Sequence, residues 1–156
     1  MSKPSFVYVT YIATTAEKVW QALIDTDIIR RYWGGLTAGV PAYENVSDWK
    51  PGSQWQQRRL DEAKTVTLVG KVLESTPPRR LVLTWARPED ADNAEKTSRV
   101  TFDIEPQGDR RVKLTVLHED LDPEMQRGVG AGWPQVLSNL KTLLETGHPL
   151  PTSPRS

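Results

Sequence analysis

The sequence of 156 residues contains no cysteine and only two histidines. The absence of cysteine excludes disulfide bonds, thiolate metal ligands and cysteine nucleophiles. His118 and His148 form no His-Glu-x-x-His pattern, so we expect no metal site. A Gly-x-Ser-x-Gly nucleophile elbow is also missing, and the sequence therefore predicts no catalytic residue set and no cofactor.

An excess of charge of one sign and long apolar runs are also missing. Lys plus Arg and Asp plus Glu number 20 each, which gives a formal net charge of zero. This balance provides no electrostatic reason to expect a nucleic-acid partner. The chain has no run of apolar residues long enough for a membrane span, and residues 1–9 do not resemble a targeting signal. We therefore expect a cytoplasmic protein.

The chain does contain a series of β-strand patterns. Residues 6–12 are rich in β-branched and aromatic side chains, which predicts a first strand. Turn residues separate six further candidate strands, at 40–46, 54–60, 65–75, 80–86, 97–105 and 111–119. In the last two, apolar and polar residues alternate, which is typical of antiparallel strands buried on one face.

Helical patterns lie at both ends of this series. Thr14 and Glu17 have the spacing of a capping box, which predicts a helix of about ten residues. A second short helix is expected over 28–33, ended by Gly34-Gly35. Asp122 has the position of an N-cap for a long helix over 123–146.

Pro134 and three glycines lie inside this long helical pattern, and they predict a break or kink near Trp133. The glycines favour either close packing of the helix against the sheet or a lid that needs short side chains; they are Gly128, Gly130 and Gly132.

The order of elements predicts an α+β domain. A curved antiparallel sheet of about six or seven strands, wrapped on the long helix, buries the apolar face of both. We expect one domain over residues 1–147. Residues 148–156 contain three prolines and small polar residues, which predicts a flexible tail.

Several short motifs carry a resemblance to a known family. They include Ala16-Glu-Lys-Val-Trp-Gln-Ala-Leu23, Tyr32-Trp-Gly-Gly35, Gly70-Lys-Val-Leu-Glu74, Arg80-Leu-Val-Leu-Thr-Trp85 and Gly132-Trp133. Together they resemble the helix-grip fold of the START-like (SRPBCC) superfamily, and within it the activator of heat-shock protein 90 ATPase homologue (C-terminal domain-like) family. The resemblance implies a cavity between sheet and helix that binds a small hydrophobic or amphipathic molecule.

Aromatic residues are the main candidates for lining such a cavity. Four of the six tryptophans lie in elements that would border it, although core packing is the simpler interpretation of any single one. The predicted ligand-cavity residues are Trp33, Trp55, Trp85, Phe102, Val116, His118, Trp133 and Leu137.

Few ionisable groups are candidates for a role in this cavity. His118 is in phase with the apolar residues of its strand, which suggests a polar anchor, an acid/base group or a histidine that hydrogen-bonds a neighbour. Arg59 or Arg87 could pair with a ligand carboxylate.

The leading hypothesis is a soluble domain that binds a small hydrophobic or amphipathic molecule without catalysis. One alternative is a cyclase-like enzyme of the same fold, with His118 and Glu44 as the groups to test. The other is a protein-interaction or co-chaperone-like module of the stress response, or a homodimer formed through a sheet edge or a helix.

Overall fold

The computed structural model describes residues 4–33 and 42–151. Within them the strands are β1 (Phe6–Ile12), β2 (Tyr43–Ser47), β3 (Gln54–Arg59), β4 (Val66–Thr76), β5 (Arg80–Trp85), β6 (Ser98–Pro106) and β7 (Val112–Glu119). The α-helices are α1 (Ala16–Ile24), α2 (Thr26–Tyr32) and α3 (Pro123–Thr146). Two short 3-10 turns, η1 (Pro88–Asp90) and η2 (Ala94–Lys96), connect β5 to β6.

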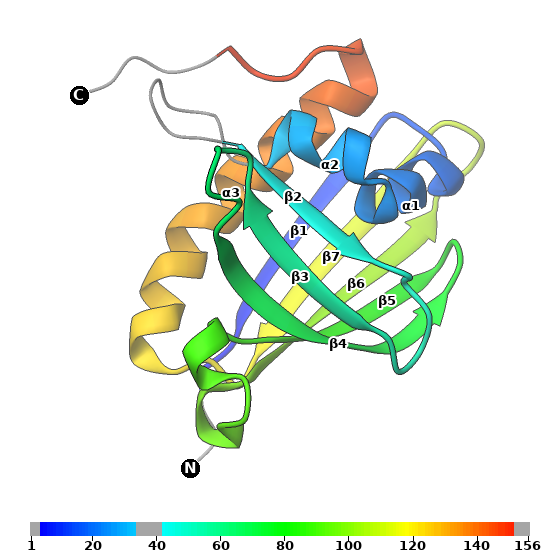
Figure 1. Cartoon of the computed structure of the whole chain (residues 1–156). Coiled ribbons are helices and arrows are strands. Elements are labelled where there is room, and N and C mark those ends of the chain that lie inside the picture. Colours follow the sequence, from blue (N-terminus) through cyan, green and yellow to red (C-terminus); the bar gives the residue numbers. More distant parts are fainter. Residues whose placement is uncertain (1–3, 34–41, 152–156) are drawn as a thin grey trace.

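The strands form one antiparallel sheet in the order β1-β7-β6-β5-β4-β3-β2. Figure 1 shows the sheet curving around α3, while α2 lies against β2 near one end. This arrangement confirms the predicted helix-grip fold. The β-branched and aromatic segment 6–12 forms the first strand with the bounds expected from its composition.

The core lies between the inner face of the sheet and α3. Alternate residues of β6 and β7 are buried there, as their period of two requires. Leu137 and Leu140 are buried on the facing side of α3. The alternation in the strands and the helical spacing in α3 are both local sequence patterns. The structure brings the two buried faces together into one core, to which β6 and β7 contribute Val100, Phe102, Ile104, Val112, Leu114 and Val116.

The first helix begins one residue later than the capping pattern suggested. Thr15, not Thr14, is the N-cap, and its hydroxyl oxygen accepts a hydrogen bond from the Lys18 amide at 3.3 Å. Asp25 both ends α1 and caps α2, where its carboxylate accepts from the Asp27 amide. The expected stop at Gly34-Gly35 lies outside the described residues.

The long helix has the predicted ends but runs unbroken. Its N-cap Asp122 accepts a hydrogen bond from the Met125 amide at 2.8 Å, and Gly147 ends it with a φ of 86°. A break near Trp133 is therefore wrong, because the helix continues past Pro134, while the alternative of a kink stays a prediction. A proline has no amide hydrogen, so α3 loses one backbone hydrogen bond there without ending.

The interior glycines of α3 do not serve close packing against the sheet. A Cβ built at any of the three would meet no neighbouring atom within 4 Å: Gly128, Gly130 and Gly132. The close-packing interpretation is therefore wrong, whereas the alternative of a lid with short side chains stays a prediction. Each glycine weakens the helix relative to alanine.

Part of the expected tail is described, and part is not. The Leu150 amide donates to Asn139 Oδ1 of α3 at 2.6 Å, whereas residues 152–156 lie outside the described part of the chain. Across residues 4–33 and 42–151, none of the helices combines the length and the apolar character needed to cross a membrane.

Candidate functional site

A set of contacting aromatic rings, here called the aromatic cluster, lies between the sheet and α3. It consists of Trp33, Trp55, Trp85, Phe102, His118 and Trp133. Trp85, the last residue of β5, is central: its ring centroid lies 5.3 Å from Trp55, 5.5 Å from Trp133 and 6.1 Å from Trp33. All six side chains are buried. Three parts of the chain therefore meet at Trp85, because these neighbours come from β3, α3 and the end of α2.

The imidazole of His118 links α3 to the sheet through a chain of hydrogen bonds. Trp133 Nε1 can only donate, and it donates to His118 Nδ1 at 3.1 Å. The ring proton of His118 therefore lies on Nε2, which donates to Ser98 Oγ at 2.7 Å. Ser98 Oγ in turn donates to the carbonyl oxygen of Trp85 at 3.1 Å. The partners thus determine the tautomer.

This network keeps His118 neutral. Its side chain is fully buried, and burial lowers the pKa of His118 to about 3. A second ring proton would lie on Nδ1 and face the N–H of Trp133, so protonation would also break that hydrogen bond. Both ring nitrogens already have partners, which favours the interpretation of a histidine that hydrogen-bonds its neighbours over an acid/base group.

The aromatic cluster contains a buried side-chain donor without a partner in the described part of the chain. Trp85 Nε1 is buried and has no hydrogen-bond partner among residues 4–33 and 42–151. The indole N–H groups of Trp55 and Trp133 both have acceptors. A buried donor without a partner costs about 1–3 kcal/mol of stability.

Trp55 reaches across β4 at a glycine. Its indole Nε1 donates to the Thr84 carbonyl oxygen at 2.7 Å, while the Lys71 amide donates to Thr84 Oγ1 at 2.7 Å. Side chains thus provide hydrogen bonds where a regular β4–β5 ladder would use backbone groups. A Cβ on Gly70 would lie 2.0 Å from the Thr84 oxygen and 2.4 Å from Trp55 Nε1. The crossing of Trp55 therefore requires glycine at position 70.

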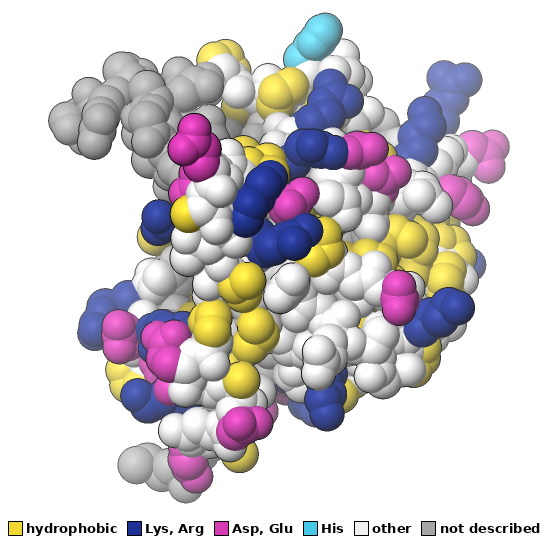
Figure 2. Space-filling view, viewed as in Figure 1, with side chains coloured by type: hydrophobic (Ala, Val, Ile, Leu, Met, Phe, Trp, Pro, Cys, Tyr) yellow, Lys and Arg dark blue, Asp and Glu magenta, His cyan; other side chains and the backbone are white. Residues whose placement is uncertain are grey.

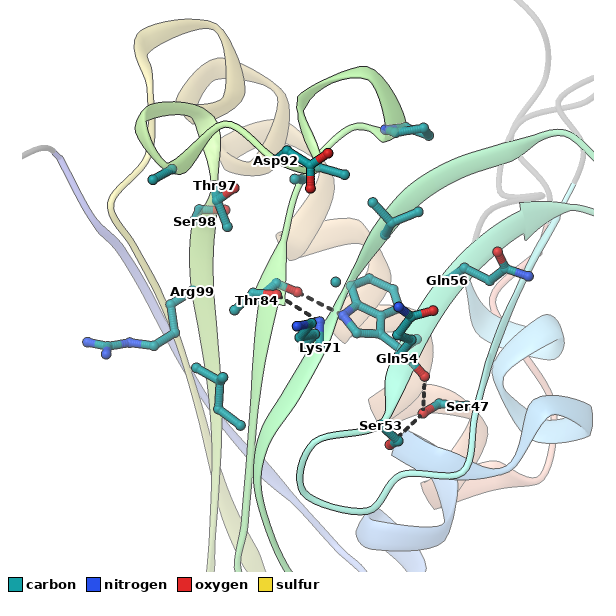
Figure 3. Close-up of a pocket in the computed structure, with 18 of the residues that line it drawn as sticks. Ser47, Ser53, Gln54, Gln56, Lys71, Thr84, Asp92, Thr97, Ser98 and Arg99 are labelled. Carbon is teal, nitrogen blue, oxygen red and sulfur yellow. Dashed lines mark hydrogen bonds between the residues drawn. The ribbon is translucent and has the colours of Figure 1, made fainter.

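A hollow of about 1330 Å³ lies on the other face of the sheet, beside the turn that carries η1 and η2. Figure 3 shows Gln54, Lys71, Thr84 and Arg99 along neighbouring strands, with the helices behind them. The lining contains amides, hydroxyls and charges of both signs. Figure 2 likewise shows acidic and basic side chains interspersed on one face of the molecule. The hollow therefore favours no single ligand chemistry.

The eight residues predicted to line a ligand cavity are all buried together between the sheet and α3. Six form the aromatic cluster, and Val116 and Leu137 belong to the same core. Of the eight, Trp55 also borders the outer hollow. Binding of a ligand by these residues stays a prediction.

Two residues of the site were missed in the sequence. Ser98 forms hydrogen bonds with residues of other strands, so no local sequence pattern identifies it. Gly70 could have been found, because an isolated glycine inside a strand pattern often marks a close approach of other atoms.

The remaining polar candidates lie elsewhere. Glu44, on β2, pairs with Arg58 at 3.1 Å, and β3, β4, β5 and β6 separate it from the strand of His118. Arg59 is exposed, while Arg87 pairs with Asp90 and Glu124. The structure therefore does not bring Glu44 and His118 together. In the described part of the chain, no three His, Asp or Glu side chains form a group that could hold a metal ion.

Comparison with known proteins identifies relatives of this arrangement. The family model described as "Activator of Hsp90 ATPase homolog 1-like protein" matches residues 13–145. A comparison with curated proteins found no match.

Solved structures share the fold. CalU16 from Micromonospora echinospora has 22% identity and a TM-score of 0.68, over 92% of this chain and 77% of that one. PFC0360w, an HSP90 activator from Plasmodium falciparum, has 22% identity and a TM-score of 0.69, over 93% and 97%. CV1439 from Chromobacterium violaceum has 17% identity and a TM-score of 0.71, over 92% and 99%.

Proposed function

Since the chain belongs to the family of Activator of Hsp90 ATPase homolog 1-like proteins, we propose that it binds a small hydrophobic or amphipathic molecule between the sheet and α3. The observation that carries the proposal is the buried, unpartnered N–H of Trp85 at the centre of the aromatic cluster. A core that only has to be stable would pair this donor or replace it with an apolar side chain. A ligand with an acceptor group would satisfy it.

The aromatic cluster also supplies the apolar surface for binding. Covering about 200–300 Å² of apolar ligand surface contributes on the order of 5–7 kcal/mol before the entropy of association is subtracted. Tryptophan rings present such surface at little entropic cost, because each has only two side-chain torsions.

Entry of a ligand requires the packed rings to separate, and α3 provides a mechanism. Its first half contains Gly128, Gly130 and Gly132, and a Cβ at any of these positions would meet no neighbouring atom within 4 Å. Pro134 removes one backbone hydrogen bond at the end of this half. Trp133 lies beside Pro134 and packs on Trp85. Local opening of this half of the helix would therefore expose the aromatic cluster.

Binding can be tested by titrating the protein with a panel of fatty acids, flavonoids, sterols and smaller aromatic ketones. We expect saturable quenching of tryptophan fluorescence by at least one compound, and a matching adduct in native mass spectrometry. Trp33→Ala should weaken binding of that compound about tenfold, because it removes the ring that contacts Trp85 and Trp133 in the cluster.

The matched control is Trp49→Ala. Trp49 has the same 9% exposure as Trp33 but lies outside the aromatic cluster, between β2 and β3. Its removal should leave the affinity within about twofold of wild type, well under the tenfold step of 1.4 kcal/mol. The absence of saturable binding across the whole panel would contradict the proposed function.

A further inference from the structure

We propose that the ligand is an uncharged molecule whose polar group is a hydrogen-bond acceptor, such as a ketone, ester, lactone or quinone oxygen, and that this oxygen accepts from Trp85 Nε1. The proposal rests on the proposed function and specifies its ligand class. It predicts that fatty acids and amines of similar size are poor ligands.

The first step of the argument concerns the direction of the hydrogen bond. An indole N–H is only a donor, and the N–H of Trp85 is a buried donor of the aromatic cluster that has no partner among the described residues. Trp85 is 5% exposed, so its donor cannot be satisfied by bulk water. The ligand group beside it must therefore be an acceptor.

The second step concerns donors on the ligand. The side-chain nitrogens of His118 are both occupied, one by Trp133 and the other by Ser98. Ser98 Oγ already accepts one hydrogen bond and donates another. The one acceptor position left on these two side chains is the second lone pair of Ser98 Oγ, whereas a ligand carbonyl oxygen meets the unpartnered donor of Trp85 directly.

The third step concerns charge. No side chain of the aromatic cluster is charged, because His118 is held neutral by burial and by its two hydrogen bonds. Arg59 is exposed, and Arg87 is paired with Asp90 and Glu124. A carboxylate or an ammonium group in the cluster would therefore be a buried charge without a counter-ion, which is strongly unfavourable.

A matched set of naphthalene derivatives separates these chemistries. The probes are 2-acetylnaphthalene, 2-ethylnaphthalene, 2-naphthoate and 2-naphthyltrimethylammonium, measured by calorimetry on the full chain. We expect the ketone to bind five- to tenfold more tightly than the hydrocarbon, since its oxygen gains one hydrogen bond to a buried donor. Both charged probes should bind at least tenfold more weakly than the ketone.

The hydrogen bond has its own readout. In ¹⁵N-correlated NMR spectra, the indole N–H resonance of Trp85 should move downfield with the ketone and not with the hydrocarbon. Trp85→Phe should bring the two affinities to within twofold of each other, while Trp49→Phe keeps the preference. If Trp85→Phe does not fold, the preference of the wild-type protein for the ketone over the hydrocarbon and the NMR shift of its Trp85 N–H still test the inference.

The outcomes distinguish the two proposals. Equal affinities for ketone and hydrocarbon, or tighter binding of a charged probe, would overturn the inference and leave the proposed function standing. Tighter binding of the quaternary ammonium would instead indicate a cation held on the ring faces. No binding of any of the four probes would count against the proposed function and the inference together.

Discussion

Gly70 lies where the indole of Trp55 crosses β4 to reach the carbonyl oxygen of Thr84. A methyl group at this position would overlap a backbone oxygen and a ring nitrogen, and backbone atoms of a central strand cannot move aside easily. We expect Gly70→Ala to lower the free energy of unfolding by about 3 kcal/mol or more. Urea unfolding followed by circular dichroism measures this loss.

Gly128→Ala is the matched control, since its added methyl group meets no atom within 4 Å. It should not destabilise the protein. A Gly70→Ala variant as stable as wild type would show that Trp55 does not cross β4 in the way described.

His118 illustrates what the sequence could and could not predict about single residues. Its phase with Val112, Leu114 and Val116 correctly placed it on the inner face of β7. Its role depends on Ser98 and Trp133, which are 20 and 15 positions away in the chain. Side-chain partners of this kind come from the assembled fold, so neither the tautomer nor the neutral state was visible in the sequence.

At the scale of elements, local patterns were sufficient for most boundaries. Local composition predicted the strand over residues 6–12, and the capping residues Asp122 and Gly147 predicted the ends of α3. The structure confirms these predictions. The cap of α1 shifted by one position because two threonines are adjacent and only Thr15 has its hydroxyl directed at the helix amides. Close packing was the wrong interpretation of the α3 glycines, because the sequence does not show which atoms an added side chain would meet.

These glycines lead to a prediction about α3. Replacing Gly128 and Gly130 with alanine should raise the free energy of unfolding by roughly 0.5–1 kcal/mol each, since alanine loses less conformational entropy in a helix. If the first half of α3 opens to admit ligand, the double variant should also bind more slowly. Urea unfolding and stopped-flow tryptophan fluorescence measure the two effects.

Gly52→Ala serves as the opposite control. Its Cβ would also meet no neighbour, but its φ of 88° is unfavourable for alanine. It should therefore destabilise the protein without slowing ligand association. Unchanged association in the Gly128→Ala, Gly130→Ala double variant would argue against entry through α3.

At the scale of the whole molecule, the fold encloses a polar network inside an apolar core. The chain Trp133–His118–Ser98–Trp85 joins α3 to β7, β6 and β5 across the interior. Each hydrogen bond of this network has one donor and one acceptor only when His118 carries a single ring proton. The stability of the whole domain is therefore linked to the protonation of this one side chain.

The sign of this linkage follows from the pKa of His118, which burial lowers from an ordinary 6.5 to about 3. Between these values the unfolded chain binds the extra proton and the folded chain does not, so stability falls as pH falls below 6.5. One such group removes about 2 kcal/mol of unfolding free energy between pH 7 and pH 5. Urea unfolding at these two pH values measures the loss.

A second group, Glu145, also links stability to pH. The hydrogen bonds from Lys141 and from the Ala13 amide lower its pKa. Its protonation therefore also reduces stability as the pH falls, but this loss begins at lower pH than that of His118.

Two variants separate this effect from general acid sensitivity. His118→Gln should be less stable than wild type at pH 7, because glutamine does not reproduce the ring geometry, yet its stability should change little between pH 7 and pH 5. His148→Gln, which alters an exposed residue, should keep the wild-type pH dependence. A wild-type protein equally stable at both pH values would mean that His118 accepts a proton inside the fold. The interior would then tolerate a charge, and the exclusion of carboxylate ligands from the aromatic cluster would lose its physical basis.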